Sequence, residues 1–117
     1  MVGQVLIIYL HNLGEHADEV GVDALDMLLA LEGQLRLAIE NAGVGEVDGH
    51  EIALDDTEGS LWIYGPDAKA MIKAALPIVC PSRLAPGGRV ILRYGARDEA
   101  AQEETFLLGD LCARRSG

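Results

Sequence analysis

The chain has 117 residues and a formal net charge of −10 at pH 7; half of its residues are apolar, but only five are aromatic. This length suits one globular domain with an aliphatic core, and the negative charge disfavours binding to the phosphate groups of nucleic acids. The longest apolar run, residues 5–10, is far shorter than the roughly 20 residues that span a bilayer, and the first residues lack the features of a secretory signal, so we expect a cytoplasmic protein.

The first third of the chain predicts a strand and a helix. Residues 5–10 are a continuous run of β-branched and aliphatic side chains, which is typical of a strand covered on both faces. Residues 11–22 mix polar and small side chains and indicate a connection. Residues 23–42 repeat apolar side chains at three- and four-residue spacing, with Asp23 as the N-cap and Gly43 just past the end, and they predict an amphipathic helix.

The middle of the chain predicts a hairpin and a second helix. Residues 51–64 contain two segments of strand character that flank the turn residues 56–59, which is typical of a β-hairpin. Pro66 and Asp67 favour the start of a helix, and Pro77 is expected to kink it or to end its regular part.

The last third predicts one strand and an ambiguous element. Residues 89–94 alternate in side-chain character and indicate a strand. Residues 105–108 fit either a short edge strand or the last turn of a helix, and we favour the strand.

The order strand, helix, strand, strand, helix, strand predicts an α+β fold of the ferredoxin-like, split βαβ type (βαββαβ), an antiparallel sheet with two helices on one face. The first and third strands are central in this topology, which agrees with the apolar runs at residues 5–10 and 61–64. We expect residues 1–97 to form this single domain. Residues 98–117 are expected to form a C-terminal extension that can add an edge strand and that ends in disorder.

The segment DGHEIALDDTEGSLWIYGPDAKAMIKAALP and the later GGRVILRYG resemble a group of small, largely uncharacterised bacterial proteins with a comparable DG-E, YGPDA and RYG layout. The resemblance covers roughly residues 46–95. It implies a fold with a hairpin, a proline-started helix and a strand end, and it implies no catalytic residue.

Two cysteines bear on the redox state of the chain. Cys80 and Cys112 form neither a CxxC pair nor a zinc-type set with the histidines. We expect two reduced thiols, as in a reducing cytosol, with a long-range disulfide as the alternative.

The segment HNLGEHADE places His11 at the end of a central strand and His16 in the following loop, among three carboxylates. It predicts either an ordinary surface loop or a metal or acid–base site, and His11, His16 and Tyr64 are the candidate catalytic residues. The acids around His50 have neither the EF-hand spacing nor an HExxH motif, so they indicate hairpin structure. No cofactor and no metal site is predicted.

Side-chain parity places Trp62 and Tyr64 on the same face of a strand. Large rings on an uncovered sheet face mark an interface, whereas core packing is the alternative. An RNA-binding platform is disfavoured by the acidity of the chain. The expected interface residues are Trp62, Tyr64, Arg93 and Tyr94.

The negative charge is concentrated in the first half of the chain. Residues 1–60 hold thirteen acidic residues and one basic residue, whereas residues 61–117 hold six acidic and eight basic residues. The sequence therefore predicts a non-enzymatic interaction module that binds a basic protein, for which an antitoxin or immunity protein is a concrete version. A solvated acidic surface that only aids solubility is the simpler interpretation.

A rival hypothesis is a small dimeric ferredoxin-like enzyme or small-molecule-binding protein. Its pocket would lie between the sheet and the helices and would contain His11, Trp62, Tyr64, Tyr94 or Arg93. Two helices cover only one sheet face, so we also expect a homodimer or a hetero-complex through the second face, with aromatic residues near its centre. The C-terminal residues 106–108 are the competing cover for that face.

Overall fold

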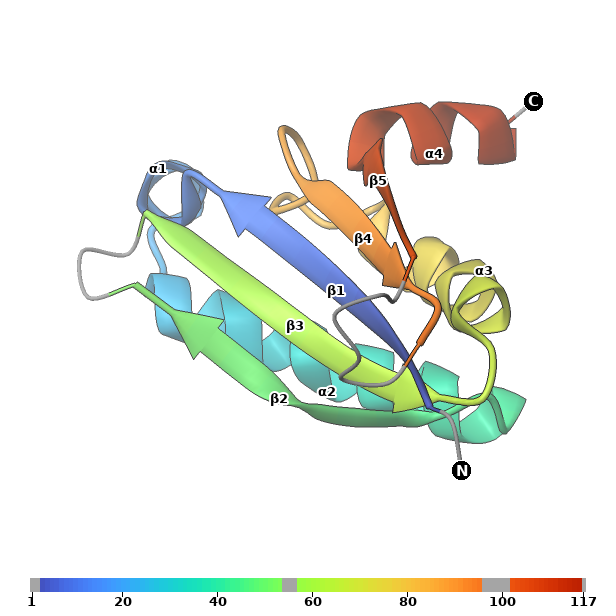
Figure 1. Cartoon of the computed structure of the whole chain (residues 1–117). Helices are drawn as coiled ribbons and strands as arrows, with labels where there is room; N and C mark the ends of the chain where they lie inside the picture. Colours follow the sequence, from blue (N-terminus) through green and yellow to red (C-terminus); the bar gives the residue numbers. More distant parts are fainter. Residues whose placement is uncertain (1–2, 54–56, 96–101, 117) are drawn as a thin grey trace.

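The computed structural model describes residues 3–53, 57–95 and 102–116, which form a five-stranded sheet and four helices (Figure 1). In chain order the elements are β1 (Gln4–His11), α1 (Leu13–Val20), α2 (Ala24–Ala42), β2 (Glu46–Ile52), β3 (Glu58–Gly65), α3 (Ala68–Val79), β4 (Arg89–Arg93), β5 (Glu103–Leu107) and α4 (Leu108–Ser116).

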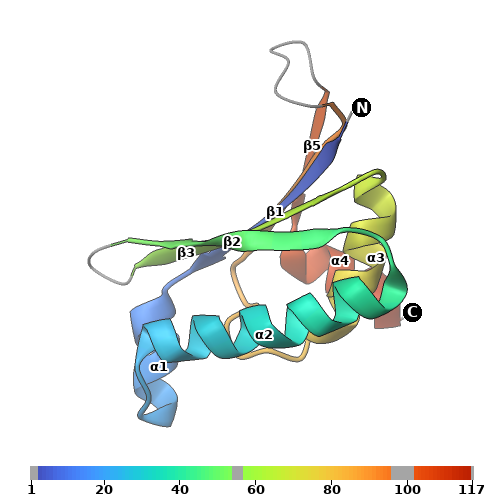
Figure 2. The same ribbon diagram turned by 90° about the horizontal axis from the view of Figure 1, so that it is seen from below.

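The strands pair antiparallel in the order β2-β3-β1-β4-β5, and the helices lie on one side of the sheet (Figure 2). The predicted α+β class and antiparallel sheet are therefore confirmed. The fifth strand and the two additional helices depart from a plain ferredoxin-like arrangement, so that specific fold stays a prediction.

Helix α1 occupies residues that the sequence analysis assigned to a connection, and this expectation is wrong. Leu13 and Ala17 are four residues apart and therefore lie on one face of the helix. Both are buried in the core, and their burial holds this short helix against the rest of the fold. The helix ends at Gly21, whose φ of 71° is left-handed and therefore suits glycine.

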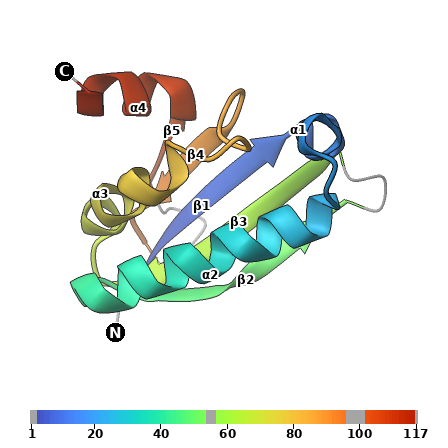
Figure 3. The same cartoon turned by 180° about the vertical axis from the view of Figure 1, so that it is seen from behind.

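The two predicted helices are present as α2 and α3 (Figure 3). Gly43 closes α2 in a left-handed conformation, as expected, whereas the side chain of Asp23 makes no capping hydrogen bond. The Asp67 side chain accepts a hydrogen bond from the backbone N–H of Lys69 and so caps α3, which continues through Pro77. In the described residues, no helix is long and apolar enough to cross a membrane.

The core lies between the sheet and the helices. Leu6, Ile8 and Leu10 of β1 point into it, as do Leu61 and Ile63 of β3, and all five side chains are fully buried. Helix α2 packs against β2 and α3, with its buried residues recurring at three- and four-residue spacing (Figure 3). One row of side chains on each strand therefore belongs to the helix side of the sheet.

The expected hairpin is present as β2 and β3, although its turn differs. Glu58 and Gly59, expected in the turn, belong to β3, and residue 56 lies outside the described residues. The pairing shifts between Val47 and Gly49, so β2 carries a bulge at Asp48.

The C-terminal segment forms both a strand and a helix. Residues 103–107 add β5 to the edge of the sheet next to β4, as favoured from the sequence, and α4 follows directly. Leu108 is buried in the core on the helix side, so this segment does not cover the second sheet face.

Cys80 and Cys112 form a disulfide that joins the end of α3 to α4. The expectation of two reduced thiols is therefore wrong, and the alternative is the one observed. The two cysteines lie 32 residues apart in the sequence, and their pairing depends on β5 and α4 folding back toward α3, which no local sequence pattern indicates.

Candidate functional site

The side of the sheet that faces away from the helices is the candidate functional surface, and we call it the open face. Strand residues alternate between the two sides of a sheet. Val5, Ile7 and Tyr9 of β1, which alternate in sequence with the buried leucines and isoleucine, therefore point to the open face. The strand register aligns these side chains in three rows, written from β2 to β5: Glu46, Tyr64, Val5, Arg93 and Glu103; Gly49, Trp62, Ile7, Ile91 and Thr105; and Glu51, Ser60, Tyr9, Arg89 and Leu107.

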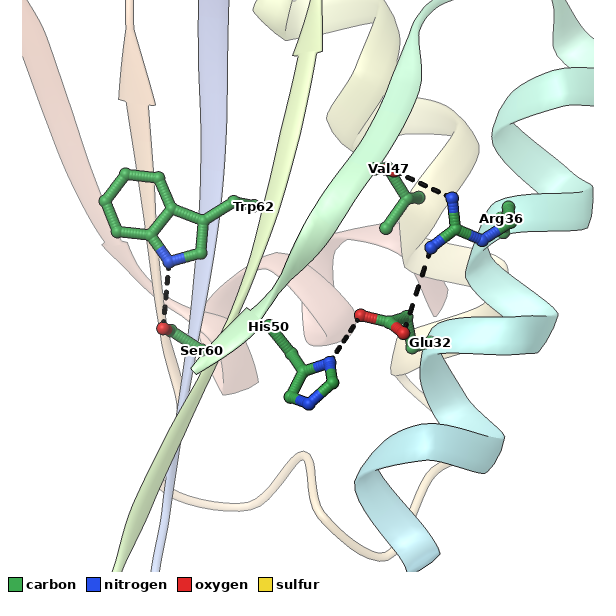
Figure 4. Close-up of polar contacts among 6 residues, drawn as sticks. All are labelled: Glu32, Arg36, Val47, His50, Ser60 and Trp62. Carbon is green, nitrogen blue, oxygen red and sulfur yellow. Dashed lines mark hydrogen bonds and ion pairs between the residues drawn. The ribbon is translucent and has the colours of Figure 1, made fainter. Parts of the chain in front are cut away.

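Aromatic side chains cover the middle of the open face. The indole Nε1–H of Trp62 donates a hydrogen bond to the Ser60 hydroxyl at 2.9 Å, and both residues lie on the opposite side of the sheet from α2 (Figure 4). Ser60 and Ile7 are buried, with 4% and 5% of their surfaces exposed, although no described helix lies over them. Tyr64 is 41% exposed. The open face therefore has a dense centre with an accessible aromatic ring beside it.

His11 lies at one end of this face in a short chain of polar contacts. Its Nδ1 lies 3.1 Å from Glu58 Oε1, and the Nε–H of Arg89 donates to its Nε2 at 3.4 Å. Because Nε2 accepts, the ring hydrogen of the neutral imidazole is on Nδ1 and is donated to Glu58. The Arg89 guanidinium also lies 5.8 Å from the centroid of the Tyr9 ring, within the range of a cation–π contact.

Two shallow hollows lie on the β2–β3 half of this surface. The first, of about 230 Å³, is next to His11 and is lined by Tyr9, Glu51, Ile52, Ala53, Glu58, Gly59 and Ser60. The second, of about 330 Å³, is lined by Asp48, Gly49, His50, Glu51, Trp62 and Tyr64. Carboxylates line both hollows, so each is suited to a cationic group.

Charge divides the open face into two halves. The β2–β3 half has Glu46, Glu51 and Glu58, and residues 37–68 of the sequence contain no lysine or arginine. The β4 strand presents Arg89 and Arg93 to the same face. Acidic hollows and basic side chains therefore lie side by side on one surface.

Tyr94 does not join Trp62 and Tyr64, although we expected the three at one interface. It packs against the core on the helix side, where the ammonium group of Lys69 lies 5.7 Å from its ring centroid. Partial burial raises the pKa of its phenol to about 12, and the hydrogen bond to the Glu104 carboxylate, the charge of Glu104 and that of Asp67 act in the same direction.

His16 is half-buried on α1, and its Nε2 has no hydrogen-bond partner among the residues that the structure describes. His11 instead contacts Glu58, from a strand 47 residues away, so the HNLGEHADE segment does not form one site. Across residues 3–53, 57–95 and 102–116, no group of three or more histidine, cysteine or acidic side chains is arranged to hold a metal ion.

A third polar cluster joins α2 to β2 on the helix side (Figure 4). The Glu32 carboxylate lies 2.9 Å from His50 Nδ1 and 3.8 Å from Arg36 Nη2. Arg36 Nη1 donates a hydrogen bond to the Val47 carbonyl oxygen at 2.8 Å. The cluster spans the bulge of β2, and its geometry is that of a structural clamp. Glu32 and Arg36 are four residues apart on one helix, so their pairing follows from helical spacing, whereas the contribution of His50 does not.

In the part of the chain that the structure describes, the space between the sheet and the helices holds no counterpart of the expected pocket. That space is filled by apolar side chains, and the hollows beside His11, Trp62 and Tyr64 lie on the open face instead.

A second exposed surface lies on the helix side, at the corner where α1 meets α2, and we call it the acidic corner. Five exposed carboxylates gather on α1, on the turn after it and on the first turn of α2: Glu15, Asp18, Glu19, Asp23 and Asp26. Val20, Val22 and Leu29 are exposed among them, and Val22 has 46% of its surface accessible. The first basic residue of the chain is Arg36, so no lysine or arginine of the preceding segment neutralises this corner.

No protein-family model matches the chain, and no curated protein matches it either. Function is therefore inferred from the geometry of these surfaces.

Proposed function

We propose that the protein is a non-enzymatic interaction module that binds a basic protein through its acidic corner. A protein that neutralises a basic toxin or nuclease, in the manner of an antitoxin or immunity protein, is the concrete form of this proposal. Such a role needs fast association, and opposite charges accelerate the encounter between two proteins.

The observation that carries the proposal is the combination of charge and exposed apolar surface at one place. Among the residues that the structure describes, six large apolar side chains are strongly exposed, and three of these lie within the acidic corner: Val20, Val22 and Leu29. A solvated acidic surface needs no apolar side chains, whereas protein interfaces combine an apolar centre with a polar rim. The two features together favour a binding surface over a surface that only aids solubility.

We further propose that this module is built on a ferredoxin-like core. The first four strands are ordered β2-β3-β1-β4 with β1 and β3 central, and α2 and α3 connect strands across the same face, which supports the assignment. Strand β5 and helices α1 and α4 are then additions to that core. Membership of the bacterial group with the YGPDA and RYG layout is part of the same proposal.

The proposal is tested by capture of a partner with the immobilised chain at low and at physiological salt. Two variants separate charge from apolar contact: Asp18→Asn with Glu19→Gln and Asp26→Asn, and Val22→Ser with Leu29→Ser. If the partner binds the acidic corner, each variant is expected to weaken its capture about tenfold or more, because binding needs both kinds of contact. If binding is simple ion exchange, only the first variant is expected to weaken capture.

A matched control removes three exposed carboxylates elsewhere: Glu40→Gln with Asp48→Asn and Asp110→Asn. Its net charge equals that of the first variant, and we expect it to capture the partner as the wild-type chain does. The proposal is rejected if no basic protein is retained at either salt concentration, or if this control loses as much as the corner variant.

A further inference from the structure

We infer that two copies of the chain pair face to face through their open faces, about a two-fold axis that runs parallel to β1. This inference goes beyond the proposed function and concerns the opposite side of the molecule from the acidic corner. It rests on the self-complementary distribution of charge and hollows over the open face.

The charges select one axis among those that bring two open faces together. A two-fold axis that lies between the sheets and parallel to β1 places the β2–β3 half of one copy on the β4–β5 half of the other, so carboxylates meet arginines. An axis perpendicular to the strands would place Arg89 on Arg93 and Glu46 on Glu51, and these like charges repel.

The row register then predicts which side chains meet. With the axis over β1, each β4 residue lies opposite the β3 residue of its own row, so Arg89 faces Ser60 of the second copy. Glu51 lies one strand from that serine, about 4.8 Å away, and Glu58 follows along β3. These residues line the hollow of about 230 Å³, so the Arg89 guanidinium enters a hollow that presents two carboxylates.

Arg93 has a corresponding position in the first row. It faces Tyr64 of the second copy, whose exposed ring borders the hollow of about 330 Å³, and Glu46 lies one strand further out. A guanidinium over a tyrosine ring with a carboxylate beside it is a favourable arrangement. At the rim, Glu46 of one copy meets Glu103 of the other. These like charges remain in solvent, and each Glu103 lies beside Arg93 of its own chain.

The middle row supplies the apolar centre of this interface. Trp62 of each copy faces Ile91 of the other, and the two Ile7 side chains face each other across the axis. An isologous dimer makes every off-axis contact twice, so two arginine side chains in each copy meet two acidic hollows in the other. A nucleic acid would be repelled by the carboxylates, and a basic partner would meet the arginines, whereas a second copy satisfies both halves.

The test exchanges the charges of one half at a time. The first variant, Arg89→Glu with Arg93→Glu, makes both halves acidic, and the second, Glu51→Arg with Glu58→Arg, makes both halves basic. The wild-type chain is expected to be a dimer by sedimentation and native mass spectrometry at micromolar concentration. Each variant alone is expected to be monomeric, and an equimolar mixture of the two is expected to form a heterodimer, because each acidic half then meets a basic half.

A third variant, Arg83→Glu with Arg114→Glu, has the same net charge as the first but alters exposed arginines outside the open face. It is expected to remain a homodimer and to form no heterodimer with the Glu51→Arg, Glu58→Arg variant. Circular dichroism shows whether each variant is folded. Formation of the heterodimer in the mixture would in addition show that both charge variants are folded.

The inference is overturned if the wild-type chain stays monomeric, if the two charge variants remain dimeric alone, or if the folded variants fail to associate when mixed. None of these results depends on capture of a basic partner. Failure of the dimer and failure of the proposed function are therefore seen in separate experiments.

Discussion

Tyr94 is the residue whose titration gives a measurable pH dependence. Its pKa is raised from 10.0 to about 12 in the folded chain, so folding favours the protonated phenol. Its contribution to stability is therefore complete below pH 10 and is lost as the pH rises from 10 to about 12. We expect the stability difference between the wild-type chain and Tyr94→Phe to shrink across this interval in urea unfolding. A difference that stays constant, or tyrosinate absorbance with an ordinary midpoint for this residue, would contradict the assignment.

Gly65 allows two backbone segments to approach each other closely. A Cβ at this position would lie 2.3 Å from the Val44 carbonyl oxygen and 3.0 Å from the Gly45 Cα atom, and neither backbone atom can move independently. We expect Gly65→Ala to lower the free energy of unfolding by about 1–3 kcal/mol, as overpacking does. Urea unfolding measures this change.

Gly49 on the neighbouring strand provides the matched control for Gly65. A Cβ there meets nothing within 4 Å, so Gly49→Ala is expected to leave stability unchanged or slightly raised. Equal losses for the two variants would show that strand propensity, and not the close approach, determines the effect.

The sequence predicts the facing of single residues well but not their partners. Alternation placed Trp62 and Tyr64 on one face, which is the observed arrangement. The same alternation puts Tyr94 on the side opposite Arg93, although we expected both at one interface. The contact between His11 and Glu58 depends on the register of β1 against β3, and the clamp of His50 on Glu32 depends on the bulge in β2. Register and bulges are set by the whole sheet, so local patterns do not reveal them.

The disulfide is the covalent link between α3 and α4. In the chain-entropy description, closing a loop between residues 32 positions apart stabilises the fold by about 3–4 kcal/mol. We expect the double substitution Cys80→Ser with Cys112→Ser to lower the free energy of unfolding by up to this amount in oxidising buffer. Reductant is expected to lower the stability of the wild-type chain toward that of the variant, and a wild-type midpoint that ignores reductant would contradict the disulfide.

Long elements were predictable and short ones were not. Helix α2 has five turns of regular apolar spacing and a glycine cap, and α3 has a proline and an aspartate at its start, so periodicity and capping identify both. Helix α1 has eight residues and α4 nine, and each places few side chains in the core. Both helices depend on tertiary packing, and α4 is also held by the disulfide; a local pattern reveals neither. The disulfide also counts against the expected reducing cytosol, so the cytoplasmic location stays a prediction.

At the scale of the whole molecule, the two proposed surfaces are compatible. The acidic corner lies with α1 and α2 on the helix side, whereas the open face lies on the other side of the sheet (Figure 2). Pairing of two open faces would therefore leave both acidic corners accessible on the outside of the dimer. A dimer with two corners could bind a multivalent basic partner more tightly than a single chain.

The disulfide also makes part of the backbone a closed ring. Strands β4 and β5 lie between Cys80 and Cys112 in the sequence, so the ring contains one edge of the sheet and the strand that joins it to β1. One peptide bond cut by a protease anywhere inside this ring leaves a single covalent molecule, since the two fragments stay joined through sulfur. Only cleavage together with reduction separates α4 from the rest of the chain, and an oxidised protein can thus be nicked there without losing its C-terminal helix.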